Sequence, residues 1–217
     1  SRGLGDVYKR QFRKYKIKTV ENKHTHLVPE ELEQLERLSL TDKHMKLQKS
    51  LDAFLFCCYA GMRYSDFTNL SKKNIVDINQ ETWLIYKSVK TGTEVRLPLY
   101  LLFAGKGIVI LNKYRNNLED FFRLRDNSNI NKDLIIIAKL AGLSKKISFH
   151  TARHTNATLL IYNGVNITTV QKLLGHKSVK TTQVYTNIMD MTIVHDLEKI
   201  KQAALGIKKK TDNSFNK

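Results

Sequence analysis

The residues after Pro29 place apolar side chains at helical spacing. Proline suits the first turn of a helix, and the acidic pair Glu30-Glu31 complements the positive end of the helix dipole. One apolar face then follows, made of Leu32, Leu35 and Leu38. The pattern therefore predicts a helix that begins at Pro29.

A second helix is predicted over residues 45–60. Its apolar positions recur at i, i+3, i+4 and i+7, which is the spacing of one helix face, and they are Leu51, Phe54, Leu55 and Cys58. Gly61 is a natural end for this helix, because glycine readily adopts the left-handed conformation that closes a helix. The cysteines Cys57 and Cys58 are adjacent, a spacing at which a disulfide is hard to form, so a reducing compartment fits.

The middle of the chain changes to short segments that are rich in Ile, Val, Trp and Tyr. Strands are predicted over residues 74–78, 82–87 and 94–99. The pair Thr91-Gly92 lies between the last two and is typical of a tight turn. These features predict a small three-stranded antiparallel sheet.

Helical patterns return after the strands. Helices are predicted over residues 108–117, 132–141, 151–163 and 168–174, and Ser178 is expected to cap a further helix that carries Tyr185. Residues 191–204 also have one apolar face, which suits a C-terminal helix. The expected fold class is mainly α with a small three-stranded antiparallel β-sheet.

Charge adds the first indication of a partner. The 217 residues carry 37 basic and 20 acidic side chains, a formal net charge of +17, which favours a polyanion and nucleic acid above all. With 41% apolar residues a core can form, which excludes global disorder. No apolar run approaches the roughly 18 residues of a membrane helix, and the N-terminus has no signal-peptide pattern, so we expect a cytoplasmic protein.

The two ends differ from the middle. Residues 1–23 are expected to be a basic arm or linker remnant, whose first eleven residues have the character of foreign sequence. Residues 206–217 are Lys-rich and polar, and we expect a disordered tail. The catalytic domain proper is expected over residues 24–205.

Three segments carry candidate chemistry, and each alone is ambiguous. Arg63 follows the second helix, and an arginine there is usually a surface cation. His150 and His154 lie one helix turn apart, a spacing that a metal site could use. However, the glutamate of an H-E-x-x-H motif is missing, and Arg153 would place a fixed cation beside the metal, so no metal is expected. Tyr185 is one of nine tyrosines, most of which serve in packing.

Taken together, the segments resemble the tyrosine recombinase family, also called phage-type integrases. The resemblance rests on the boxes Gly-Met-Arg-Tyr-Ser-Asp (61–66), His-Thr-Ala-Arg-His (150–154) and Leu-Leu-Gly-His (173–176), with Tyr185 nine residues after His176. The segment 88–92, Ser-Val-Lys-Thr-Gly, resembles the hairpin lysine of the family. The likeness covers roughly residues 24–205 and implies the catalytic-domain fold of these DNA breaking and rejoining enzymes.

The resemblance implies a transesterification without cofactors or metal. Tyr185 would attack a DNA phosphate and form a 3′-phosphotyrosyl bond, while Arg63, Arg153 and His176 stabilise the charge of the transition state. His150 would accept the tyrosine proton, and Lys90 would protonate the leaving oxygen. Asp66 and His154 are assigned supporting roles.

The resemblance also implies partners and leaves two alternatives open. The expected partner is double-stranded DNA, with a homotetramer on paired sites and a monomer allowed when free, and no membrane partner. The family's separate amino-terminal DNA-binding domain does not fit within the first 23 residues. A nicking-closing enzyme like type IB topoisomerases, or an inactive DNA-binding module, would share parts of this pattern.

Overall fold

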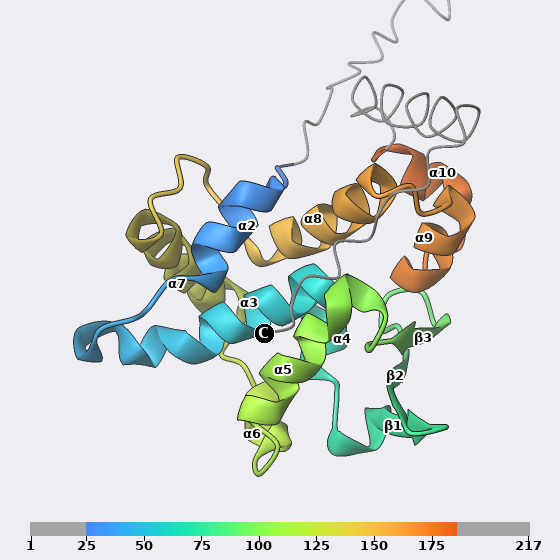
Figure 1. Ribbon diagram of the computed structural model, residues 1–217, viewed down its shortest axis with the longest axis horizontal. Helices are drawn as coiled ribbons and strands as arrows, with labels where there is room; N and C mark the ends of the chain where they lie inside the picture. Colours follow the sequence, from blue (N-terminus) through green and yellow to red (C-terminus); the bar gives the residue numbers. More distant parts are fainter. Residues whose placement is uncertain (1–24, 186–217) are drawn as a thin grey trace, which may run out of the picture.

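The computed structural model describes residues 25–185 (Figure 1). In the first half it contains α2 (Pro29–Glu36), the 3-10 helix η1 (Asp42–Leu47), α3 (Gln48–Ala60), α4 (Tyr64–Thr68), η2 (Lys72–Asn74) and the strands β1 (Ile75–Ile78), β2 (Glu81–Lys87) and β3 (Glu94–Pro98). The second half contains η3 (Leu102–Gly105), α5 (Lys106–Lys113), α6 (Leu118–Phe122), α7 (Asn127–Leu140), α8 (Phe149–Tyr162), α9 (Ile167–Leu174) and α10 (Val179–Gln183). The predicted fold class is confirmed.

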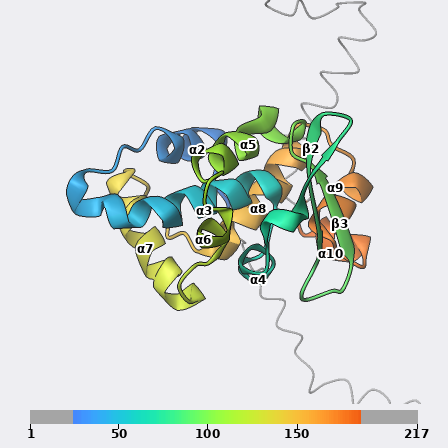
Figure 2. The same ribbon diagram turned by 90° about the horizontal axis from the view of Figure 1, so that it is seen from below.

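Helices α3 and α8 form the centre of the molecule. Every residue from Ser50 to Ala60 is buried, as is every residue from Thr151 to Ile161. The two helices pack against each other, with α7 at one end of the molecule and the sheet at the other (Figures 1 and 2). Because both helices are buried on all sides, polar side chains on them must find partners inside the protein.

The end of α3 shows how this requirement is met. The last carbonyls of a helix have no partner within the helix. Asn156 on α8 donates its Nδ2 group to the carbonyls of Cys58 (2.9 Å) and Tyr59 (3.0 Å), and Arg153 donates Nη1 to the carbonyl of Gly61 (2.7 Å). Helix α8 therefore supplies the C-terminal partners of α3 and fixes where the chain leaves it.

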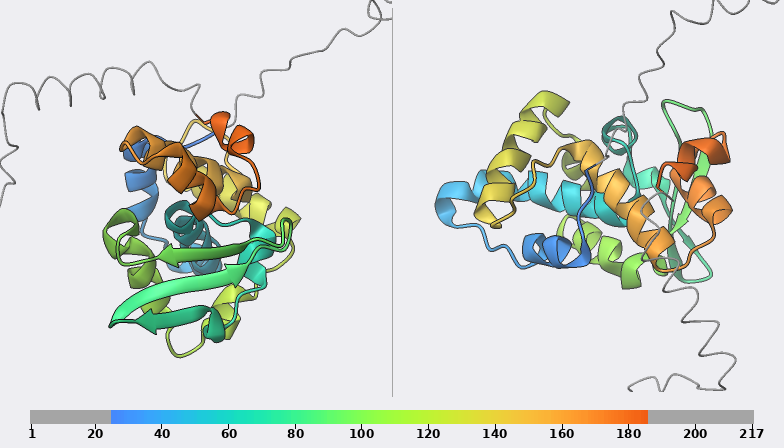
Figure 3. Two further views of the ribbon diagram at one scale, coloured as in Figure 1. Left: turned by 90° about the vertical axis from the view of Figure 1, so that its right-hand side faces the viewer. Right: turned by 90° about the horizontal axis from the view of Figure 1, so that it is seen from above.

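The sheet has the order β1-β2-β3, with both pairs antiparallel. Leu84 and Tyr86 alternate with more exposed residues on β2, so one face of this strand is buried. Helix α9 lies beside β3 rather than β1 (Figure 3). The strand predictions are correct to within one residue. The predicted turn at Thr91-Gly92 is also present, since residues 89–91 form a turn and the Ser88 N–H donates to the Thr93 carbonyl (2.8 Å). A shorter, two-residue connection, residues 79–80 with positive φ, joins β1 to β2.

Three helix predictions differ from the structure at their ends. The predicted helix 45–60 begins only at Gln48, because the preceding residues form η1. Helix α7 begins five residues before the predicted 132, since the side chain of Asp126 accepts the backbone N–H of Asn129 and caps the helix there. Helix α5 ends at Lys113 rather than 117.

The predictions near the chain ends have different outcomes. Ser178 caps α10 as predicted, since its Oγ accepts the backbone N–H of Lys180, but α10 ends at Gln183 and Tyr185 lies beyond it. The arm 1–23, the tail 206–217 and the predicted helix 191–204 lie outside the described residues.

Gly61 offers a test of the junction between α3 and α8. It has φ +67°, and a Cβ there would lie 2.6 Å from Asn156 Oδ1 and 2.9 Å from Leu174 Cδ2. We expect Gly61→Ala to lower the free energy of unfolding by about 3 kcal/mol, from the left-handed backbone and the clash together. Gly142→Ala is the matched control, because its φ is +75° but its Cβ would meet nothing within 4 Å. Equal losses in urea unfolding would contradict this account of the junction.

Candidate active site

Arg63 is placed by the turn that follows Gly61. It is the N-cap residue of α4, and its side chain is 15% exposed. Its Nη1 lies 3.4 Å from Ser88 Oγ and 3.6 Å from the Asp66 carboxylate. Asp66 is buried and also accepts the backbone N–H of Val89 (2.8 Å). Asp66 thus connects Arg63 to the start of the loop between β2 and β3.

Arg153 is buried at the centre of the site, with 1% of its surface exposed. Its Nη1 donates to the Gly61 carbonyl (2.7 Å) and its Nη2 to the Leu174 carbonyl (2.6 Å). Burial and the charge of Arg63 lower its pKa to about 10, so the guanidinium stays protonated at neutral pH. The carbonyls of Gly61 and Leu174 are neutral, so neither removes the positive charge of Arg153.

His176 follows Gly175, which ends α9 with φ +62°. Its Nδ1 lies 2.9 Å from Thr182 Oγ1, and the residue is 7% exposed. Burial lowers its pKa to about 4, and the charges of Arg153 and Arg63 act in the same direction. His176 is therefore neutral at pH 7, and with Thr182 donating to Nδ1 it would carry its proton on Nε2.

Lys90 lies in the loop between β2 and β3, and its side chain is exposed. The next residue, Thr91, donates its hydroxyl to the Gly175 carbonyl (3.1 Å), which joins the tip of this hairpin to the turn before His176. The charge of Lys90 also contributes to the low pKa of His176. The predicted lysine therefore lies within electrostatic reach of the predicted histidine.

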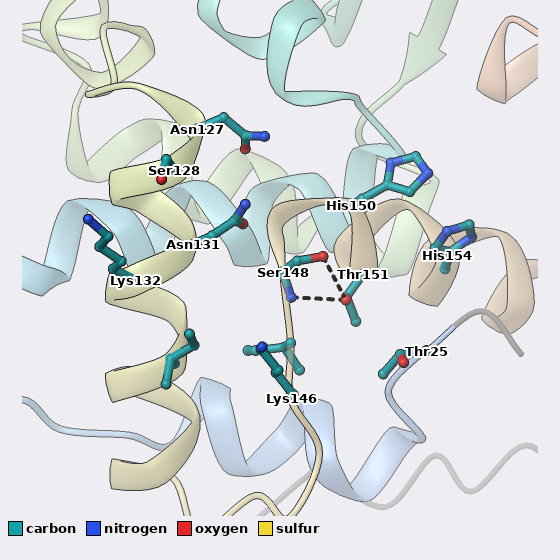
Figure 4. A pocket seen from close by; sticks show the side chains of 12 residues that line it. Thr25, Asn127, Ser128, Asn131, Lys132, Lys146, Ser148, His150, Thr151 and His154 are labelled. Carbon is teal, nitrogen blue, oxygen red and sulfur yellow. Dashed lines mark hydrogen bonds between the residues drawn. The ribbon is translucent and has the colours of Figure 1, made fainter. Parts of the chain in front are cut away.

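Tyr185 is buried, with 5% of its surface exposed, and its Oη lies 3.1 Å from His154 Nδ1. Burial raises its pKa, while the charges of Arg153 and Arg63 act to lower it. The rings of His154 and His150 meet edge to face with their centroids 4.4 Å apart, at the start of α8 (Figure 4). His154 is therefore a direct partner of the tyrosine hydroxyl, and Arg153 also forms a hydrogen bond that acts to lower the pKa of Tyr185. The sequence analysis assigned the tyrosine proton to His150.

The structure brings all eight predicted residues into one region, through contacts or through their charges. Three further residues connect them and were missed by sequence reasoning: Ser88 between Arg63 and Asp66, Thr91 beside Gly175, and Thr182 beside His176. Ser88 and Thr91 lie in the segment 88–92 that the sequence analysis singled out for Lys90, and Thr182 lies three residues before Tyr185, but no pattern assigned these hydroxyls a role. Within residues 25–185, no group of three His, Cys, Asp or Glu side chains could hold a metal ion.

In residues 25–185 there is also no helix that is both long and apolar enough to cross a membrane.

The low pKa of His176 predicts how stability depends on pH. The folded value of about 4 lies below the usual 6.5, so the unfolded chain binds more protons between these values. The contribution of neutral His176 to the free energy of unfolding is fully present above pH 6.5. It is lost as the pH falls to about 4, and the total loss is about 3 kcal/mol. We expect His176→Gln to remove this part of the pH dependence in urea unfolding. Parallel curves for the two proteins would contradict it.

Known tyrosine recombinases match this chain in sequence. A tyrosine recombinase of Pseudothermotoga lettingae is 30% identical over 181 residues, which cover 81% of this chain and 60% of the relative. Tyrosine recombinase XerD of Bifidobacterium longum is 50% identical over 171 residues, 71% of this chain and 54% of the relative. The chain thus spans little more than half the length of these relatives.

Solved structures of the same kind share the fold. The crystal structure of XerA recombinase has a TM-score of 0.63 and 26% identity, and the match covers 82% of this chain and 65% of that one. A lambda integrase dimer bound to a COC′ core site has a TM-score of 0.59 and 20% identity over 74% of this chain and 58% of that one, which shows the fold alone. The sequence model of the phage integrase family matches residues 25–191. Since this match covers most of the 217 residues, the chain belongs to the phage integrase family of tyrosine recombinases.

Proposed function

We propose that this chain carries the catalytic domain, over residues 24–205, of a site-specific DNA recombinase or integrase. The proposal rests on the proximity of Arg63, Arg153 and Tyr185. The charges of the two arginines act to lower the pKa of Tyr185, although 122 positions separate Arg63 from Tyr185 in the sequence. A phenol beside two permanent cations is suited to attack a phosphodiester. Relatives that are named tyrosine recombinases support the same reaction.

The two arginines stabilise the negative charge that develops on the phosphate during the reaction. Negative charge collects on the non-bridging oxygens of the phosphate as the fifth bond to phosphorus forms. Arg63 and Arg153 offer planar forks of permanent donors for these oxygens, and neutral His176 adds a donor through Nε2. This arrangement needs no metal ion to neutralise the phosphate.

The protons move at two places. The Tyr185 oxygen bonds to phosphorus and its proton passes to a histidine, while the bond from phosphorus to the deoxyribose 5′-oxygen breaks and Lys90 protonates that oxygen. The product is a 3′-phosphotyrosyl bond with a free 5′-hydroxyl. A 5′-hydroxyl of a partner strand reverses the step, and the energy of the broken bond is kept.

The partner is double-stranded DNA, and the assembly is a homotetramer on paired sites. Among the proteins of similar fold, a lambda integrase tetramer is described bound to a Holliday junction, with a TM-score of 0.58. XerH recombinase is described bound to a palindromic difH substrate in a post-cleavage complex, with a TM-score of 0.60. These proteins support the proposal through their fold, at 19% and 21% identity.

The covalent intermediate tests the reaction. The chain is incubated with a library of nicked duplexes of randomised sequence, and protein–DNA adducts are separated on a denaturing gel and sequenced. We expect an adduct that EDTA does not suppress, and Tyr185→Phe should abolish it while DNA binding remains nearly unchanged. No adduct from the wild-type chain, or an adduct that survives Tyr185→Phe, would refute the assignment. Relaxation of supercoiled DNA without strand exchange would instead favour a topoisomerase-like activity.

The acceptor of the tyrosine proton can be identified by comparing two histidines. Because His154 Nδ1 lies 3.1 Å from Tyr185 Oη, we expect His154→Gln to slow adduct formation about 100-fold. His150→Gln is the matched control on the same helix, and it should have a smaller effect near neutral pH. A larger loss for His150→Gln would restore the sequence-based assignment, in which His150 accepts the proton.

A further inference from the structure

Tyr86 is a buried polar side chain that has no part in the reaction described above. It lies on β2, the middle strand of the sheet, opposite Val95 of β3, and it is 5% exposed. Its hydroxyl has no hydrogen-bond partner within residues 25–185. A hydroxyl that is buried without a partner destabilises a fold. The stability of the free protein therefore does not account for it.

The strand places Tyr86 on the face of the sheet that meets Asp66. The ladder between β2 and β3 continues to Ser88, whose N–H donates to the Thr93 carbonyl (2.8 Å). Tyr86 and Ser88 are two positions apart, so their side chains lie on the same face, and both are buried while the residue between them is exposed. Ser88 Oγ lies 3.3 Å from Asp66 Oδ1. The side chain of Tyr86 thus lies on the face that contacts Asp66.

The charges around the Tyr86 hydroxyl agree with this placement. Burial raises the pKa of Tyr86, and the charge of Asp66 acts in the same direction. The charges of Arg153 and Arg63 act to lower the same pKa. The hydroxyl therefore lies within electrostatic reach of the acid and of both arginines, and it keeps a proton that it can donate at neutral pH.

Asp66 has unused capacity to accept a hydrogen bond. Its carboxylate accepts one short bond, from the N–H of Val89 (2.8 Å). Its contacts with Ser88 Oγ (3.3 and 3.4 Å) and with Arg63 Nη1 (3.6 Å) are longer than usual. An ionised carboxylate can accept about four hydrogen bonds. A phosphate in front of Arg63 would compete with Asp66 for the guanidinium, and a buried carboxylate that loses a cationic partner is destabilised.

We propose that Tyr86 is a positioning residue, whose hydroxyl donates to the Asp66 carboxylate when Arg63 turns toward the DNA phosphate. This inference rests on the proposed function, because the phosphate is what draws Arg63 away from Asp66. The new hydrogen bond replaces the weakened ion pair and keeps Asp66 on the Val89 N–H, at the base of the hairpin that carries Lys90. Tyr86 acts on the phosphate only through Asp66 and Arg63.

The substitution Tyr86→Phe removes the hydroxyl and keeps the buried ring. We expect no decrease in the free energy of unfolding of the free protein, because the hydroxyl has no partner there. With saturating protein and a nicked duplex that forms the Tyr185 adduct, single-turnover adduct formation should slow about tenfold. The protein concentration that gives half the maximal rate should change by no more than about twofold. Tyr100→Phe is the matched control, a tyrosine that packs on Trp83 (ring centroids 6.2 Å apart), and it should keep the wild-type rate.

Two further measurements separate positioning from a general effect on the core. A methylphosphonate at the cleaved position removes the negative charge that Arg63 binds, so the loss caused by Tyr86→Phe should shrink to no more than about twofold. In an Asp66→Asn background, Tyr86→Phe should likewise add little further loss.

The outcomes distinguish this proposal from the proposed function. A wild-type rate for Tyr86→Phe, or an equal loss on phosphate and methylphosphonate, would overturn the role of Tyr86 and leave the Tyr185 reaction intact. Full additivity with Asp66→Asn would also overturn it, because Tyr86 would then not act through Asp66. If the wild-type chain forms no adduct at all, both proposals are wrong, since Tyr86 would have no phosphate reaction to support.

Discussion

The buried guanidinium of Arg153 is the interaction on which the site depends. A cation inside a protein is costly unless groups of opposite polarity surround it. Here the carbonyls of Gly61 and Leu174 come from the C-terminal ends of α3 and α9, where the helix dipoles leave partial negative charge. These dipoles stabilise the cation without cancelling its charge. The same two bonds hold the turn before Arg63 and the turn before His176 at a fixed separation.

The surroundings of Tyr185 also keep its phenol protonated, because burial raises its pKa. Burial disfavours the phenolate, and the arginines only partly offset this effect. A phosphate in front of Arg63 and Arg153 would change the balance of charge, and the tyrosine would then need a proton acceptor close by. His154 lies beside the Tyr185 hydroxyl, next to His150 at the start of α8.

Local patterns in the sequence predicted most of the fold, and the differences have local causes. The strands were recognisable because β-branched and aromatic residues cluster there, and the buried α3 showed clear helical spacing. The start of α7 was missed because residues 127–131 are mostly polar, and the cap by Asp126 determines it. Tyr185 was placed on a helix because Ser178 signals a start, whereas no residue signals the end at Gln183.

For the site, too, residues within short motifs could be predicted from the sequence, whereas contacts between distant segments could not. Motif spacing singled out Arg63, Arg153 and Tyr185, and the structure brings these three residues into one region. The contact between His154 and Tyr185, 31 positions apart, could not be deduced, since it depends on how the end of α10 returns to α8. The same is true of Ser88 and Thr182, whose hydroxyls only gain a role once distant segments meet.

The bond from Thr91 to the Gly175 carbonyl has a mechanical consequence. Lys90 precedes Thr91 directly, and Leu174, whose carbonyl holds Arg153, precedes Gly175 directly. If the tip of the hairpin moves, either the bond between Thr91 and Gly175 breaks, or the neighbouring Leu174 carbonyl that accepts from Arg153 moves with it. Under the proposed function, Lys90 and Arg153 would therefore change position together, so one movement of this loop would place or withdraw both the proton donor and a phosphate-binding group.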